Sequence, residues 1–112
     1  MAPTATAQSV QLAAKLFRGF GDPVRLGLLL VLADGEQRVT DLVQLVGGSQ
    51  SNVSGHLACL RDCGLVLDRP VGRQVFYRLA SDEVFTLLRA AEALLAATGS
   101  DVDLCPNYEA PA

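Results

Sequence analysis

The part of this chain that most constrains its fold is residues 40–64, where a pair of glycines separates two short helical patterns. The first pattern, TDLVQLV, stops at Gly47 and Gly48, and Ser49 is a suitable N-cap for the second, QSNVSGHLACLRDC. Gly64 then stands where a helix commonly ends in a left-handed residue. A short helix, a glycine-containing turn and a second helix are typical of a helix-turn-helix unit.

The spacing of apolar residues changes after Gly64. Residues 65–70 (LVLDRP) and 74–80 (QVFYRLA) are short runs rich in Val, Tyr and Phe, and a Pro- and Gly-containing turn joins them. This pattern predicts a β-hairpin. A hairpin directly after a helix-turn-helix unit predicts the winged form of that fold.

Three further helices are expected around this unit. Apolar residues recur with a helical period from Ser9 until GFGDP interrupts them, and Asp22 with Pro23 forms a good helix start. A last helical stripe follows Ser81 or Asp82 and ends at Gly99. The helices are expected at residues 9–20, 23–33 and 83–98, which makes the chain mainly α with a β-hairpin wing.

Length and composition fit one domain. The chain has 112 residues, half of them hydrophobic, which is enough to bury a core without disulfides. No apolar run reaches the ~18–20 residues needed to cross a bilayer, and three cysteines, an odd number, suit a reducing compartment. We therefore expect a cytoplasmic protein with no membrane partner. Residues 1–8 form a flexible N-terminus, residues 9–98 the folded domain, and residues 99–112 an acidic, cysteine-bearing tail.

The net charge of −3 is unevenly distributed. Residues 1–80 hold eight basic and six acidic side chains, whereas residues 81–112 hold one basic and six acidic ones. This pattern excludes a strongly basic, non-specific nucleic-acid binder. It allows a modest basic surface in the middle of the chain.

The start of the second helix of a helix-turn-helix unit meets base edges in the major groove. Here it carries short polar side chains of the kind that pair with bases, together with a glycine that permits close approach. The hairpin adds arginines suited to phosphate or minor-groove contact. An ordinary solvated helix start is the alternative. The expected partner is double-stranded DNA, and the candidate contacts are Gln50, Ser51, Asn52, Ser54, Gly55, His56, Arg69 and Arg73.

Cys59 and Cys63 lie four residues apart on that same helix, so they share one of its faces. Free cysteines often behave as small buried hydrophobes, but Cys105, in the polar segment DLCPN, has little reason to join a core. Three thiolates without a fourth ligand suit a thiophilic ion such as Cd(II) or Pb(II). A structural zinc site usually has four ligands, so Zn(II) is a possible but less fitting inducer.

Two neighbours of the thiol pair have open roles. His56, the single histidine of the chain, could be a fourth ligand or could simply pack and form hydrogen bonds. Arg61 lies between the two cysteines in sequence and could lower the pKa of their thiols.

Three segments, DPVRLGLLLVLADGE, SQSNVSGHLACLRDCGLV and GRQVFYRL, resemble the ArsR/SmtB family of bacterial metal-responsive repressors. The two cysteines on the recognition helix and the tail cysteine resemble its cadmium- and lead-sensing members. The resemblance implies a homodimer, formed by the first and last helices, that binds a palindromic operator and leaves it when metal binds. It also implies Cys59, Cys63 and Cys105 as the ligands of Cd(II) or Pb(II), with Cys105 supplied by the other protomer.

Other classes of function were compared with this one. A thiol redox or persulfide sensor on the same fold could use a Cys59–Cys63 disulfide. However, cysteines four apart on an intact helix have near-parallel Cβ directions that suit that bond poorly. A protein-interaction module without DNA is a further alternative. An enzyme is not expected, because the sequence shows no nucleophile–base pair and no glycine-rich phosphate loop.

Overall fold

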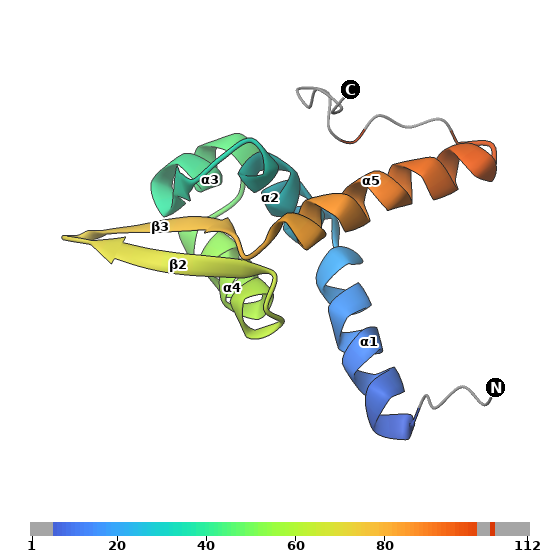
Figure 1. Ribbon diagram of the computed structural model, residues 1–112. Helices are drawn as coiled ribbons and strands as arrows, with labels where there is room; N and C mark the ends of the chain where they lie inside the picture. Colours follow the sequence, from blue (N-terminus) through green and yellow to red (C-terminus); the bar gives the residue numbers. More distant parts are fainter. Residues whose placement is uncertain (1–5, 101–103, 105–112) are drawn as a thin grey trace.

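The computed structural model describes residues 6–100 and residue 104 (Figure 1). Within this part, helices α3 and α4 and the hairpin β2–β3 form a winged helix-turn-helix, as the sequence predicts. The elements are α1 (Ala7–Phe20), α2 (Pro23–Ala33), β1 (Gln37–Arg38), α3 (Val39–Val46), α4 (Gln50–Asp62), β2 (Val66–Val71), β3 (Gln74–Leu79) and α5 (Asp82–Ala97).

Side-chain caps set where the first two helices begin. Helix α1 starts at Ala7 rather than at the expected Ser9, because the Thr6 hydroxyl accepts a hydrogen bond from the Ser9 backbone N–H at 3.0 Å. Helix α2 starts at Pro23 as expected. The Asp22 carboxylate accepts hydrogen bonds from the backbone N–H groups of its first turn, at 2.9 and 3.1 Å.

A glycine ends the recognition helix α4. Gly64 has a φ of 77°, a conformation that favours glycine. The Leu65 N–H donates to the Leu60 carbonyl at 2.9 Å, and the Gly64 N–H donates to the Arg61 carbonyl at 3.0 Å. These two bonds form a Schellman motif, which fixes the direction in which the chain leaves α4 and enters β2.

The sheet contains a strand that the sequence did not predict. The strand order is β1-β3-β2, all antiparallel, with Gln37 opposite Tyr77 and Val71 opposite Gln74. Strand β1 is two residues long, so it carries no alternating pattern. Gly72, with a φ of 60°, makes the tight turn at the hairpin tip.

The hydrophobic core lies between the helices and the base of the hairpin. The inward stripe of α4 is fully buried, as its spacing predicts, and seats the helix on α2 and the sheet. The buried hydrophobic residues are Leu28, Leu29, Leu32, Leu42, Val53, Leu57, Leu60, Leu65, Val66, Tyr77, Val84 and Leu88.

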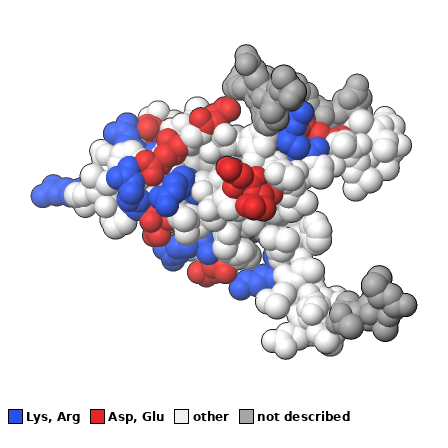
Figure 2. Space-filling model, viewed as in Figure 1, with Lys and Arg blue, Asp and Glu red and all other residues white. Residues whose placement is uncertain are grey.

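Helix α1 and the outer end of α5 project from this core (Figure 1). They carry large apolar side chains that remain exposed, with 64% of Leu12, 59% of Phe17 and 67% of Leu94 accessible. In the view of Figure 2 the outer ends of these two helices are mostly uncharged. The charged side chains of α1 and α5 are Lys15, Arg18, Asp82, Glu83, Arg89 and Glu92. Apolar surface of this kind is typical of a protein–protein interface. Across residues 6–100, no helix combines the length and the hydropathy needed to span a membrane.

Candidate DNA interface and thiol pair

The start of α4 exposes polar side chains to solvent on one side and buries apolar side chains on the other. Ser49 caps the helix by accepting a hydrogen bond from the Asn52 N–H at 3.1 Å. Val53 is completely buried, and so are Leu57 and Leu60 further along the helix. Five of the candidate DNA contacts lie on the exposed side of this start, namely Gln50, Ser51, Asn52, Ser54 and Gly55.

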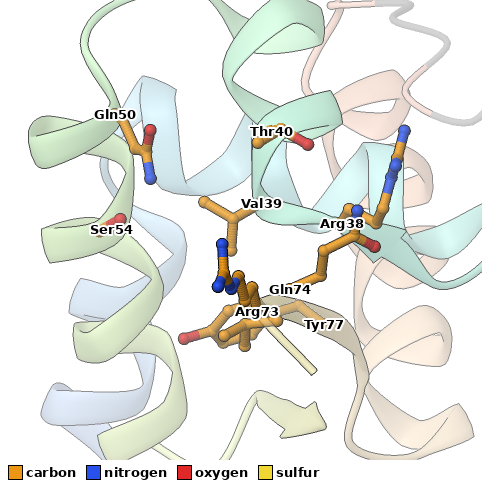
Figure 3. A pocket seen from close by; sticks show the side chains of 9 residues that line it. Arg38, Val39, Thr40, Gln50, Ser54, Arg73, Gln74 and Tyr77 are labelled. Carbon is orange, nitrogen blue, oxygen red and sulfur yellow. The ribbon is translucent and has the colours of Figure 1, made fainter. Parts of the chain in front are cut away.

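A cavity of about 220 Å³ lies between the start of α4, the start of α3 and the hairpin. Figure 3 shows Gln50 and Ser54 on one side of it, with Arg38 and Thr40 on the other. The Arg73 side chain rises between them from the hairpin tip. None of the described residues that line the cavity is acidic. The cavity therefore offers hydrogen-bond donors and positive charge beside the helix start.

The two arginines of the cavity differ in charge balance. Arg38 forms a bidentate ion pair with Asp41, at 3.0 and 3.1 Å, so a carboxylate of the protein already balances its positive charge. Arg73 forms no ion pair with any residue in the described part of the chain. Arg73 is therefore the group of this cavity best able to meet an external anion.

Arg69, the other candidate arginine of the hairpin, has a partner within the protein. Its guanidinium forms two hydrogen bonds with Glu36, at 2.6 and 3.1 Å, and lies 5.0 Å from the centre of the Phe76 ring. The hydrogen bond from Arg69 lowers the pKa of the Glu36 carboxyl group. The structure thus uses Arg69 to brace the hairpin against the loop before β1.

His56 faces helix α2. Its Nδ1 lies 3.4 Å from Nη1 of Arg25 and 4.0 Å from the Asp22 carboxylate. Because a guanidinium can only donate, a hydrogen bond between these two groups has Nδ1 as its acceptor. Of the two roles considered from the sequence, packing with a hydrogen bond is the one this geometry supports.

The two cysteines of α4 lie together and are partly buried. Cys63 is the C-cap residue of the helix, and its thiol donates to the Lys15 carbonyl of α1 at 3.8 Å. Burial raises the pKa of the Cys63 thiol above its usual value, and the neighbouring Cys59 thiol adds to the rise.

The expectation that Arg61 lowers the pKa of these thiols is wrong for Cys63. The Arg61 guanidinium turns to Asp68 on β2, where an oxygen lies 3.0 Å away. The positive charges that do act on Cys63 are those of Lys15 and Arg25, and they only partly offset the effect of burial.

Helix α1 approaches the thiol pair closely at Gly19, which is buried. A Cβ atom at this position would lie 2.9 Å from Cδ1 of Leu65 and 3.8 Å from Sγ of Cys63. Only glycine fits here without a shift of Leu65. The backbone of α1 therefore lies directly beside the end of the recognition helix.

The described residues bring together two of the three predicted metal ligands. Cys105 lies outside them. Within residues 6–100 and 104, no three His, Cys, Asp or Glu side chains form a metal-binding group. The Leu104 N–H donates to the Glu92 carboxylate of α5 at 2.9 Å, so Leu104 lies against α5.

Comparison with known proteins identifies the family. Residues 22–67 match the family described as "Bacterial regulatory protein, arsR family". The chain is 38% identical to a probable mercury resistance operon repressor of Streptomyces lividans, covering 82% of this chain and 74% of that protein. This chain belongs to the arsR family. It is also 40% identical to the HTH-type transcriptional regulator CmtR of Mycobacterium tuberculosis, covering 79% of this chain and 75% of that protein.

Solved structures of this arsR family share the fold. The homodimeric winged helix-turn-helix DNA-binding domain Mb0332 of Mycobacterium bovis, a possible ArsR-family regulator, is 26% identical. It superposes with a TM-score of 0.70 over 85% of this chain and 93% of that one. The expected family and fold class are confirmed. The family and these relatives are transcriptional regulators rather than enzymes, which confirms that expectation as well.

Sequence reasoning missed several residues around both sites. Thr40 and Tyr77 line the cavity, and Arg25 with Gly19 links α1 to α4. The only local signal was the position of Arg25 in the first turn of α2, close to the end of α1. The other contacts depend on packing between distant segments.

Proposed function

We propose that this chain is a repressor that binds operator DNA as a homodimer and releases it when Cd(II) or Pb(II) binds cysteine thiolates. The observation that carries the proposal is the position of Cys59 and Cys63, together on the helix whose start exposes polar side chains. The same helix would then serve DNA reading and metal sensing. Similarity to CmtR and to a probable mercury resistance operon repressor supports this function.

The DNA contacts follow from the cavity and from the start of α4. Gln50, Ser51, Asn52 and Ser54 would meet base edges, and the exposed Gly55 would let the helix approach closely. Arg73 would meet a backbone phosphate, which positions the helix without reading sequence. Arg69 and His56 already have protein partners, so we do not assign them to DNA: Arg69 braces the hairpin through Glu36, and His56 contacts Arg25.

The dimer would form through α1 and α5. Their exposed Leu12, Phe17 and Leu94 provide an apolar surface, and the similar Mb0332 domain is homodimeric. Two copies of the chain would present two recognition helices, as a palindromic operator requires. Helix α1 would then belong both to the dimer interface and to the surroundings of the thiol pair.

The thiolates of Cys59, Cys63 and Cys105 would hold the inducing ion. Soft sulfur ligands select thiophilic metals, and the cysteine pair already shares one face of α4. Release requires that the ion bind the DNA-free form more tightly than the DNA-bound form. Cys105 lies outside the described residues, and we propose that it comes from the other protomer of the dimer.

The proposal is tested by titrating Cd(II) and Pb(II) into wild type and Cys105→Ser bound to operator DNA under reducing conditions. Wild type should leave the DNA and show thiolate-to-metal charge-transfer absorption, whereas the variant should lose both responses. Normal release by Cys105→Ser would contradict the three-thiolate site. Release that occurs only after oxidant is added, without metal, would replace metal sensing by thiol redox sensing.

A further inference from the structure

Two separate contacts hold the end of α1 against the recognition helix. In the first, the Cys63 thiol donates to the Lys15 carbonyl at 3.8 Å, and the buried Gly19 lies beside the same thiol. This contact lies at the C-terminal end of α4, where the thiol pair is.

The second contact runs through Arg25 of α2. Its Nη2 donates to the Arg18 carbonyl at 2.7 Å, and its Nε donates to the Gly19 carbonyl at 3.3 Å. Both carbonyls belong to the last turn of α1, where the Arg18 carbonyl also accepts a hydrogen bond from the C-cap Gly21 N–H at 3.2 Å. The remaining nitrogen, Nη1, lies 3.4 Å from Nδ1 of His56 on α4. One guanidinium therefore joins α1 to α4.

His56 lies between the two functional ends of α4. It precedes Cys59 by three residues and follows Asn52 by four, so it is about one helical turn from each. A pull on His56 would act on α4 close to the residues that face DNA. The Asp22 carboxylate, which caps α2 and lies 4.0 Å from Nδ1, holds the start of α2 in place next to this contact.

The end of α1 also borders the space beside the thiol pair. The Lys15 carbonyl lies 3.8 Å from Sγ of Cys63, and a Cβ atom at Gly19 would lie 3.8 Å from the same sulfur and 2.9 Å from Cδ1 of Leu65, so α1 packs against Cys63 and Leu65 on this side. A ligand that joined Cys63 from this side would displace the end of α1. Because Arg25 holds two carbonyls of that segment, the displacement would reach His56.

We propose that Arg25 is a positioning residue that couples occupancy of the thiol pair to the DNA-reading start of α4, through its contacts with Arg18, Gly19 and His56. This inference rests on the proposed function, because it explains how an ion bound at Cys59 and Cys63 weakens DNA binding at the other end of the same helix. Arginine suits this role because its planar fork supplies several donors in fixed directions, whereas lysine has one nitrogen.

The test compares operator affinity with and without metal in wild type, Arg25→Lys, Arg25→Gln and His56→Ala. The probe is whichever of Cd(II) and Pb(II) releases wild type. Couplings between two sites typically reach about 5–150-fold, and the three variants should retain about twofold or less. The metal affinity of Arg25→Lys and His56→Ala, followed by charge-transfer absorption, should stay close to that of wild type. Arg25→Gln should bind metal more weakly, because it removes one of the positive charges that lower the pKa of Cys63. Arg61→Gln is the matched control, since Arg61 lies between the thiols but bonds Asp68, and it should release normally.

The outcomes separate the inference from the function on which it rests. If no metal releases wild type, the proposed function fails. If wild type responds and folded Arg25 variants respond equally, the coupling role of Arg25 is wrong. Folded variants that no longer bind DNA without metal would also contradict it, because the link would then serve binding rather than release. His56→Ala breaks the other end of the link and keeps the test decisive if substitution of Arg25 unfolds the chain.

Discussion

Replacement of Arg73 by alanine should make operator binding less dependent on salt. Arg73 projects from the hairpin into a cavity without acidic lining and has no ion-pair partner in the described part of the chain. Each phosphate that a protein neutralises contributes about −0.9 to the slope of log K against log salt concentration. A dimer carries two hairpins, so Arg73→Ala should make the slope shallower by about 1.8.

This change is large enough to measure. Between about 50 and about 200 mM salt, a slope difference of 1.8 alters the ratio of wild-type to variant affinity by about 12-fold. Fluorescence anisotropy with labelled operator, repeated at several salt concentrations, measures both slopes. The relative preference for operator over unrelated DNA should remain nearly unchanged, because phosphate contacts carry no direct sequence information.

Arg61→Ala is the matched control. It also removes one arginine, but that arginine is paired with Asp68 at 3.0 Å and lies at the far end of α4 from the cavity. Its slope should equal that of wild type. If Arg73→Ala retains the wild-type slope, Arg73 does not contact phosphate and the DNA-facing role of this cavity is refuted. If both variants lose the same slope, the effect reports overall charge only.

Three other predictions concern metal binding, folding and assembly. Because burial raises the pKa of the Cys63 thiol, that thiol keeps its proton at neutral pH and must release it to bind Cd(II). The apparent Cd(II) affinity should therefore rise about tenfold per pH unit for each proton released, and a pH-independent charge-transfer titration would contradict this. Leu57→Ala, at a fully buried position of α4, should lower the free energy of unfolding by about 2–5 kcal/mol; a loss in urea denaturation below about 1 kcal/mol would show that the site is not tightly packed. Phe17→Asp, on the exposed face of α1, should shift sedimentation toward monomers, while Leu45→Asp, equally exposed on α3, should leave it unchanged.

The sequence was sufficient for the architecture because its boundaries are local. Asp22, Ser49 and Gly64 each cap a helix through contacts within a few residues. The hairpin is predicted by the change in the spacing of apolar residues after Gly64. Strand β1 was not predicted, because two residues cannot show an alternating pattern and because its pairing with β3 is a tertiary contact. The start of α1 at Ala7 was not predicted, because a threonine N-cap within a polar segment is a weak sequence signal.

The candidate sites were predictable in residue type but only partly in geometry. Helical spacing alone placed Cys59 and Cys63 on one face, yet it could not show that this face is packed against α1. Arg69 looked free for DNA because Glu36, its partner, is 33 residues away along the chain. The same reason hid the Arg25–His56 contact, which joins residues 31 positions apart. Each missed contact therefore depends on which elements pack together, and that information is absent from any single segment.

The brace between Arg69 and Glu36 has a consequence for how DNA would be chosen. Because this pair and β1 tie the hairpin to the body of the protein, they limit how far the hairpin can move relative to the start of α4. The distance between a phosphate held at the tip and the bases met by the helix is then set by the protein. DNA whose groove width or bend does not match that distance has to deform, and the energy of deformation depends on its sequence. Base pairs that no side chain touches would thereby contribute to operator selection.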